Sequence, residues 1–202
     1  METFSNLFNI ILTGDKESSR KAARQVGKFL HSFYGQEQFD EIRPIIEKAP
    51  EEYAKITEDF RQVNFVIAIS VIYFLHNRES QPDFLFPWLF SLLWHKNGNI
   101  RYAVARMIEN ELGPLTYHIR FPDEARTVPS ISPAKADQIL LELFFVLNTL
   151  LRESWKPEYK KYKYIDSLPS GTYKTVQLIL SELEEDCGKE YIKQMEKTLH
   201  IT

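Results

Sequence analysis

Apolar residues recur along this chain at spacings of three and four positions. One stripe runs through the segment RKAARQVGKFL and consists of Ala22, Ala23, Val26, Phe29 and Leu30. A second stripe consists of Ile100, Val104, Met107, Ile108 and Leu112. This spacing places apolar side chains on one face of an α-helix, and the two-residue alternation of a half-buried strand is missing from the sequence. The periodicity therefore predicts an all-α fold.

Start and stop signals divide the chain into separate helices. Asp15 and Ser132 are placed to cap helices, and Asn99 is expected to cap a helix that ends at Gly113–Pro114. Pro44 predicts either a kink or a division into two short helices. Residues 116–132 and 156–171 are expected to be loops. The predicted helices cover about residues 15–33, 36–48, 59–76, 80–95, 99–113, 134–154, 172–186 and 189–199, with a further helix starting at Pro50.

Composition limits the class of protein. A chain of 202 residues with 44% hydrophobic content is long enough for one sizeable core, so we expect a single domain over residues 1–202. The formal net charge of −3 gives no basic excess for nucleic acid or a membrane surface. The longest apolar runs, Phe65–Leu75 and Phe84–Trp94, are too short to cross a bilayer. With one cysteine, Cys187, and no signal-peptide pattern, we expect a cytoplasmic protein.

Four helical segments align with one another and indicate a repeat. They begin at Ser19, Gln62, Asn99 and Thr172, and their separations correspond to one or two units of about 40 residues, the period of two-helix repeat proteins. A repeat of this kind buries its apolar face against its neighbours. The alternative is a globular helical bundle in which the helix pairs look alike because all helical hairpins share the same pattern.

The segment from Pro87 to Gly113, PWLFSLLWHKNGNIRYAVARMIENELG, resembles a HEAT repeat. A first helix with proline is followed by a short polar turn, and a second helix opens with Arg101 and carries Ala103 and Ala105. The segment from Gly14 to Leu30 is similar. The resemblance to the HEAT-like, armadillo-type superfamily implies a right-handed α-solenoid of about four to five helix pairs.

The resemblance also implies that the second helices line a concave binding surface. On the helix after Asn99 the candidate binding residues are Arg101, Arg106, Glu109 and Asn110. An arginine near a helix start also commonly bonds to an adjacent turn, and for Arg101 this structural role is the stronger interpretation. Arg106 is the better candidate for contact with a ligand.

A second candidate site is the segment KPEYKKYKY, in which Tyr159, Lys160, Lys161 and Lys163 combine positive charge with aromatic rings. Such a segment suits phosphates and stacked bases. It also suits an acidic protein partner, or tyrosines that fold back onto the helices while the lysines stay solvated. The acidic run ELEEDCGKE is expected to be a solvated face, or to pair with this lysine-rich segment.

No catalytic, cofactor or metal motif is found in the sequence. The histidines lie far apart without a metal-ligand spacing, and neither a GxSxG motif nor a glycine-rich phosphate loop occurs. Cys187 is expected to be buried or incidental rather than a nucleophile. The three tryptophans, Trp88, Trp94 and Trp155, are expected in the core. We therefore predict no cofactor, no metal and no catalytic residue.

Two functions follow from these observations. The leading hypothesis is a non-enzymatic helical-repeat scaffold that binds a protein or peptide on its concave surface. The alternative is a HEAT-like DNA-binding protein, similar to the alkylpurine DNA glycosylases built from such helical pairs. The acidic balance of the chain disfavours nucleic acid as the partner, and no membrane contact is expected.

Overall fold

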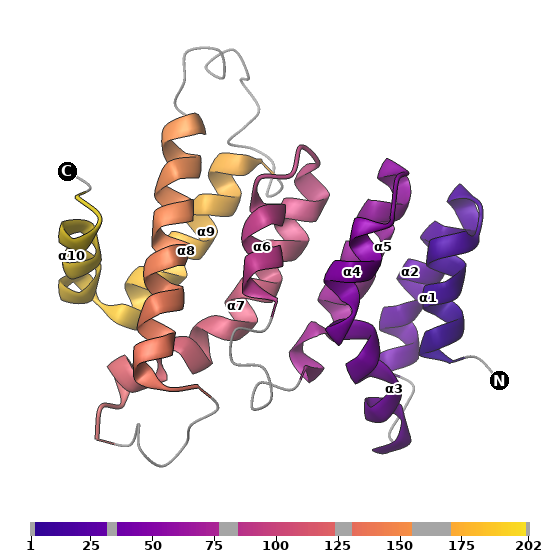
Figure 1. Ribbon diagram of the computed structural model, residues 1–202, viewed down its shortest axis with the longest axis horizontal. Helices are drawn as coiled ribbons and strands as arrows, with labels where there is room; N and C mark the ends of the chain where they lie inside the picture. The colour runs from indigo at the N-terminus through magenta and orange to yellow at the C-terminus, as the bar shows by residue number, and fades with distance from the viewer. Residues whose placement is uncertain (1–2, 32–35, 77–84, 124–130, 155–170, 201–202) are drawn as a thin grey trace. The chain divides into compact units, whose positions relative to one another are not determined.

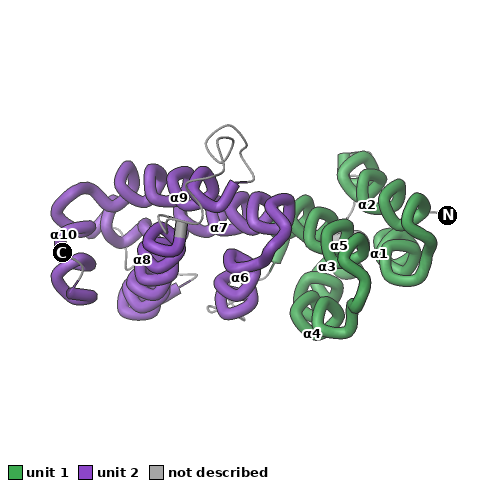
Figure 2. The backbone as a smooth tube through the Cα atoms, turned by 90° about the horizontal axis from the view of Figure 1, so that it is seen from above, with its two compact units in different colours: residues 1–77 green, residues 78–202 purple. Residues whose placement is uncertain are grey.

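The computed structural model describes residues 3–31, 36–76, 85–123, 131–154 and 171–200. Within these ranges the chain is helical and forms no strand, as the periodicity predicts. The chain divides into two compact units, residues 1–77 and 78–202 (Figure 2). Each unit is described by itself, and the continuity of a single repeat domain across both stays a prediction.

The first unit is built around two neighbouring pairs of helices (Figure 1). Helices α1 and α2 form a hairpin; α5 packs against α2, and α3 packs against α1. The unit therefore has two layers, with α2 and α5 side by side in one of them (Figure 2). Its elements are α1 (Phe4–Thr13), α2 (Lys16–His31), α3 (Gln36–Glu47), α4 (Ala49–Ala54), α5 (Asp59–Ile72) and the 3₁₀ turn η1 (Tyr73–Leu75).

Side-chain caps fix the start of the first two helices. Thr3 accepts a bond from the Asn6 amide at the start of α1, and Asp15 accepts one from the Ser18 amide at the start of α2. The cap at Asp15 confirms the predicted helix start. The sequence analysis predicts no helix over the residues of α1, because no start signal is recognised before its apolar residues.

Two predicted details of this unit are resolved by the structure. Pro44 lies inside α3, which continues as one helix to Glu47 rather than dividing into two. Pro50 stands in the first turn of α4 together with Glu51, as predicted. The helix is short, however, and ends at Ala54.

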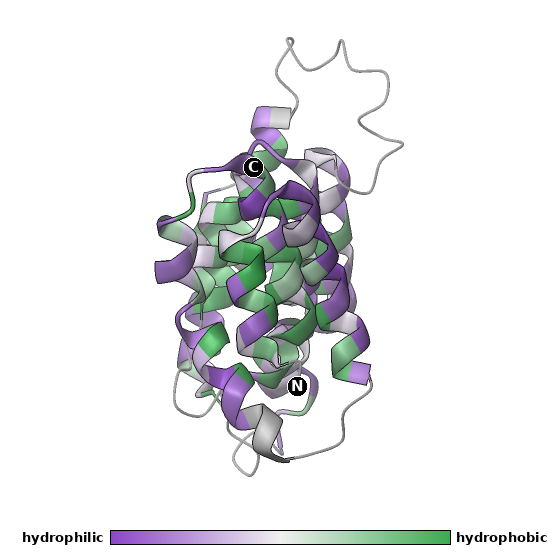
Figure 3. Ribbon diagram, turned by 90° about the vertical axis from the view of Figure 1, so that its right-hand side faces the viewer, coloured by the Kyte–Doolittle hydropathy of each residue, from purple (hydrophilic) through white to green (hydrophobic). Residues whose placement is uncertain are grey.

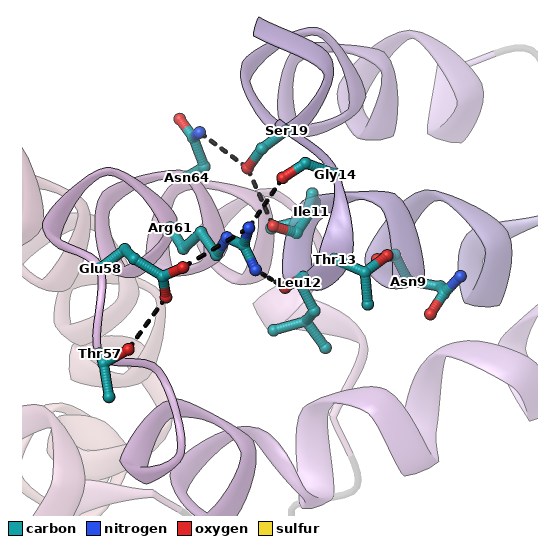
Figure 4. A network of polar contacts seen from close by, with 10 residues as sticks. All are labelled: Asn9, Ile11, Leu12, Thr13, Gly14, Ser19, Thr57, Glu58, Arg61 and Asn64. Carbon is teal, nitrogen blue, oxygen red and sulfur yellow. Dashed lines mark hydrogen bonds and ion pairs between the residues drawn. The ribbon is translucent and has the colours of Figure 1, made fainter. Parts of the chain in front are cut away.

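Polar contacts join the α1–α2 hairpin to α5 (Figure 4). Ser19 is fully buried; its Oγ donates to the Ile11 carbonyl at 2.9 Å and accepts from Asn64 Nδ2 at 3.0 Å. Arg61 at the start of α5 donates to the carbonyls of Leu12 and Gly14. These half-buried carbonyls lie where α1 ends, where the last carbonyls of a helix lack partners within it, so Arg61 satisfies acceptors that the helix leaves open.

The second unit consists of two helical hairpins and a final short helix. Helix α6 pairs with α7 and α8 pairs with α9, and the hairpins stack so that α6 contacts α8 while α7 lies along α9 (Figure 2). The last helix packs against α9. The elements are α6 (Phe86–Leu93), α7 (Gly98–Arg120), α8 (Pro133–Ser154), α9 (Thr172–Cys187) and α10 (Lys189–Thr198).

Helix α7 differs from the prediction at both ends. Its N-cap is Asn97, which accepts from the Asn99 amide, so Asn99 is not the cap. The helix also continues through Gly113–Pro114 to Arg120, where the sequence predicted a stop and then a loop. Burial explains the continuation, because Leu115 and Thr116 beyond the proline are almost completely buried. Apolar burial of this size outweighs one lost backbone bond.

Helix α6 also begins later than predicted. Its N-cap is Leu85, so the helix starts at Phe86, and the predicted cap Ser80 lies outside the described residues. Leu85 has a φ of 58°, a left-handed conformation that is costly for a leucine. Its side chain is buried, and this burial offsets the strain.

Hydrophobic and hydrophilic residues alternate around the helices (Figure 3), and the buried positions are almost all hydrophobic. Of the tryptophans, Trp88 is buried as predicted, whereas Trp94 is 48% exposed and the prediction for it is wrong. Trp94 is the C-cap of the short helix α6 and so lies at the end of the helix rather than within its buried side. Trp155 lies outside the described residues. None of the described helices is both long enough and apolar enough to span a bilayer.

Candidate binding surface

Helices α7 and α9 lie side by side and run parallel. Thr116 Oγ1 on α7 donates to Asp186 Oδ2 on α9 at 2.8 Å, across 70 positions of sequence. Closer to the start of both helices, Glu109 and Glu182 interact electrostatically. The Thr116–Asp186 pair lies further along both helices than the Glu109–Glu182 pair, so the two helices run in the same direction. These are two of the helices that the sequence alignment placed in equivalent repeat positions.

One side of α7 is buried, and a strip on another side is exposed or half-buried. The residues that face neighbouring helices include Val104, Ile108 and Leu112. The strip consists of Tyr102, Arg106, Glu109 and Asn110, with Tyr102 38% exposed. Their spacing of four, three and one residues keeps them on one side of the helix.

Helix α9 continues this strip with its own exposed side chains. Leu178 is 37% exposed, and Glu182 lies one turn further along the same flank. The negative charge of Glu182 acts on Glu109 across the helix pair. The α7–α9 surface is defined by Tyr102, Arg106, Glu109, Asn110, Leu178 and Glu182.

The α7–α9 surface is acidic at its centre. Burial raises the pKa of Glu109, and the negative charge of Glu182 raises it further, while Arg106 acts in the opposite direction. The arginine does not cancel the other two effects, because the net shift is upward. The α7–α9 surface thus carries two interacting carboxylates, the half-buried Glu109 and the exposed Glu182, with the opposite charge of Arg106 on the same strip.

Three of the four candidate residues predicted on this helix lie on the surface, and Arg101 does not. Its Nη1 donates to the carbonyls of His95 and Lys96, at 2.6 and 3.1 Å. Burial lowers the pKa of the guanidinium. Arg101 thus holds the turn between α6 and α7, the structural role that the sequence analysis considered stronger. Arg61 holds the turn after α1 in the same manner (Figure 4).

The second predicted site cannot be placed. Tyr159, Lys160, Lys161 and Lys163 lie outside the described residues. The acidic run, which is predicted as a possible partner of these lysines, lies within the described residues. Glu184 and Glu185 are exposed, and Asp186 accepts a hydrogen bond from Thr116. The run is therefore exposed at Glu184 and Glu185 and hydrogen-bonded at Asp186, and its pairing with the lysine-rich segment stays a prediction.

A polar cluster that the sequence did not reveal joins the end of α7 to α8 and α10. His118 Nε2 lies 2.8 Å from Asp137 Oδ1 on α8, and the Tyr191 hydroxyl on α10 donates to the same oxygen. Burial and the bond to Asp137 raise the pKa of Tyr191. At the end of α7, Arg120 donates a hydrogen bond to the carbonyl of Gly113, the residue before Pro114, at 2.9 Å.

The cluster has the composition of a catalytic site but not its chemistry. Cys187 is buried nearby, and desolvation together with the charge of Asp186 raises the pKa of its thiol to about 12. A nucleophilic cysteine needs a lowered pKa, because the thiolate is the reactive form. The cluster therefore serves to hold α10 and the end of α7 against α8. No group of three or more metal-ligating side chains is found among the residues that the structure describes.

Comparison with known proteins gives no relative: no protein-family model, curated protein or solved structure matches the chain. The resemblance to HEAT repeats accordingly stays a prediction. The function has to be argued from the surface itself.

Sequence reasoning missed Tyr102, Leu178 and Glu182 as members of the surface. Tyr102 had a usable signal, since it stands four and seven positions before Arg106 and Glu109. Leu178 had none, because an apolar residue in the apolar segment TVQLIL carries no local sign of exposure. The packing of α9 along α7 is visible only in the structure.

Proposed function

We propose that the protein is a non-enzymatic helical-repeat scaffold that binds a protein or peptide partner on the face formed by its second helices. The observation that carries the proposal is the side-by-side packing of second helices within each unit, α2 with α5 and α7 with α9. In a HEAT-like α-solenoid such helices form the continuous concave face. The proposal extends this arrangement to the whole chain.

The chemistry of the α7–α9 surface supports a macromolecular partner. It combines an aromatic residue, an arginine, an aliphatic residue and carboxylates, all at helix positions whose backbones are fixed by packing. Aromatic residues and arginine are enriched in protein–protein interfaces, where they contribute most of the binding free energy. A rigid helical face also loses little conformational entropy on binding.

The test uses the full chain and a matched pair of double variants. Tyr102→Ser with Arg106→Glu changes the α7–α9 surface, and Phe145→Ser with Arg152→Glu changes an exposed aromatic and an exposed arginine on α8. We expect partners captured by the wild-type chain to be lost with the first variant and retained with the second. Circular dichroism checks that both variants fold. Equal capture by both variants, or no partner at all for a folded sample, contradicts the proposal.

DNA binding stays the alternative, without an observation that favours it. Its candidate residues, including Lys160 and Lys161, lie outside the described residues. The described part of α9 exposes Glu182, Glu184 and Glu185, and negative charge repels a phosphate backbone. A gel-shift titration at low salt separates the two functions: salt-sensitive retardation of DNA favours the alternative, and its absence leaves the scaffold.

A further inference from the structure

We propose that α10 is a two-state latch. In the docked state, which the structure shows, α10 folds back beside α8 and α9 (Figure 1). In the released state it swings out as an intact continuation of α9, by a change of backbone angles at Gly188 alone. Asp137 on α8 is the catch that holds the docked state. This inference goes beyond the proposed binding function and does not depend on it.

The hinge of the latch is a single residue. Gly188 is both the C-cap of α9 and the N-cap of α10, so no other residue separates the two helices. Its φ of 78° belongs to a region that glycine adopts freely and that is costly for residues with a side chain. A Cβ at Gly188 would meet nothing within 4 Å among the described residues beyond its chain neighbours. Glycine is therefore needed for the bend in the backbone and not for space.

The backbone on both sides of the hinge is already helical. The Gly188 amide donates to the Glu184 carbonyl at 3.0 Å, and the Ile192 amide donates to the Gly188 carbonyl at 3.3 Å. Both bonds have the four-residue spacing of an α-helix. Helical angles at Gly188 would join α9 and α10 into one helix and pair the last carbonyls of α9 with the first amides of α10. The released state gains these backbone bonds and loses the docking contacts, so the two states oppose each other as in a bistable element.

Few side chains hold α10 in the docked state. Its apolar face consists of Tyr191, Ile192 and Met195, which lie on one side of the helix at spacings of one, three and four residues. Within α10, which the structure describes in full, Met195 alone is buried, at 4% exposure. A helix of ten residues is marginal by itself, so its position depends on what it contacts.

The catch is one carboxylate oxygen. The Tyr191 hydroxyl donates to Asp137 Oδ1, and His118 Nε2 at the end of α7 lies 2.8 Å from the same oxygen. Burial and the bond to Asp137 raise the pKa of Tyr191, so its hydroxyl keeps the proton that it donates. The docked α10 and the end of α7 thus share one acceptor on α8. Release of α10 removes one of these two contacts and leaves the contact with His118 in place.

The experiment measures the distance between α8 and α10 by double electron–electron resonance. Spin labels are attached at Glu142→Cys and Lys197→Cys, both exposed positions, in the full chain with Cys187→Ala. The hinge variant is Gly188→Ala, which disfavours the φ of 78°. The matched control is Gly113→Ala, a glycine inside α7 where a Cβ makes only an ordinary contact.

We expect a single short distance without a hinge change and in the Gly113→Ala control. In Gly188→Ala most of the distribution should shift to a distance longer by at least about 10 Å, because Lys197 follows Gly188 by nine residues at 1.5 Å each. Circular dichroism should show unchanged helicity, since α10 stays helical after release.

The catch is tested in the same labelled chain. Tyr191→Phe removes only the hydroxyl, and the matched control is Tyr173→Phe, because the Tyr173 hydroxyl accepts from Gln177 within α9. We expect Tyr191→Phe to add a second population at the long distance found for Gly188→Ala. Tyr173→Phe should add none.

Three other results overturn the proposal or a part of it. An unchanged short distance in Gly188→Ala shows that α10 stays docked without the bend, and overturns the latch. A broad distribution with lost helicity shows that α10 unfolds instead of moving as one helix, and also overturns it. A long distance in Gly188→Ala without a second population in Tyr191→Phe overturns the assignment of Asp137 as the catch.

Discussion

Asn64 on α5 donates a hydrogen bond from Nδ2 to the Oγ of Ser19 on α2, at 3.0 Å and across 45 positions of sequence. The bond joins α5 to α2 at a buried point. The Ser19 hydroxyl in turn donates a hydrogen bond to the Ile11 carbonyl of α1. Three helices of the first unit thus meet in one polar chain (Figure 4). Buried polar chains of this kind fix which helices pack together, because any other arrangement leaves their members unpaired.

The first prediction concerns this bond. Asn64→Ala leaves the buried Ser19 hydroxyl without its donor, so we expect the free energy of unfolding to fall by about 1–3 kcal/mol in urea titrations. Ser19→Ala added to it should cost less than the sum of the single changes. Thr13→Ala is the control, because its hydroxyl bonds to Asn9 on the exposed side of α1 and should change stability little. Additive effects of Asn64→Ala and Ser19→Ala contradict the coupling.

The second prediction tests the continuation of α7 beyond Gly113. Pro114→Ala restores a backbone donor inside the helix and removes the clash of the proline ring, while it releases some unfolded-chain entropy. We expect a net gain in the free energy of unfolding of about 1–2 kcal/mol. Pro133→Ala is the matched control, because Pro133 is the first residue of α8, where the missing donor costs nothing. A loss of stability for Pro114→Ala contradicts the continuous helix and favours the predicted stop.

The third prediction is a pH dependence at Glu41. Its carboxylate accepts the amides of Ser5 at 2.7 Å and Phe4 at 3.2 Å and so caps α1. Burial raises the pKa of Glu41, but the bonds from Ser5 and Phe4 outweigh burial and the net pKa is lowered from 4.5. The stabilisation is therefore complete above pH 4.5 and is lost as the pH falls through the lowered pKa.

Glu41→Gln should accordingly reduce the free energy of unfolding at neutral pH by about 0.5–2 kcal/mol, with the difference from wild type shrinking in acid. Glu47→Gln, an exposed change on the same helix, is the control. Thermal unfolding followed at several pH values measures both. A difference that stays constant down to low pH argues against the carboxylate cap.

The fourth prediction concerns the reactivity of Cys187. Because desolvation raises the pKa of the thiol to about 12, almost none of it is thiolate at neutral pH. We expect a thiol reagent such as 5,5′-dithiobis(2-nitrobenzoic acid) to react very slowly with the native chain and rapidly in denaturant. Rapid reaction of the native chain would show an accessible thiolate and reopen the polar cluster as a catalytic site.

The helices could be predicted where local signals and packing agree. Asp15 and Ser132 precede α2 and α8 in the structure, because a capping side chain and a following apolar stripe act on the same few residues. The prediction of α7 failed at Gly113–Pro114 for the opposite reason. The local stop signal is real, but burial of Leu115 and Thr116, which depends on distant helices, outweighs it.

The surface could be predicted only on one helix. The strip with Arg106, Glu109 and Asn110 follows from helical spacing, whereas Leu178 and Glu182 belong to α9, which only the folded chain packs along α7. The bonds of His118 and Tyr191 to Asp137 are also long-range. Contacts between helices that are distant in sequence produce no characteristic residue spacing, so only the structure reveals these residues.

Helices α7 and α9 pack along each other, and the interaction of Glu109 with Glu182 requires the two residues to lie near each other across this pair. Cross-linking tests this directly: Glu109→Cys and Glu182→Cys, in a chain with Cys187→Ala, are treated with a short bis-maleimide and followed by gel mobility. The account predicts an efficient internal cross-link in the native chain, lost in denaturant, and little cross-link when Glu182→Cys is replaced by Glu184→Cys. Equal cross-linking of the two pairs, or none for Glu109 with Glu182, would contradict the pairing and the surface built on it.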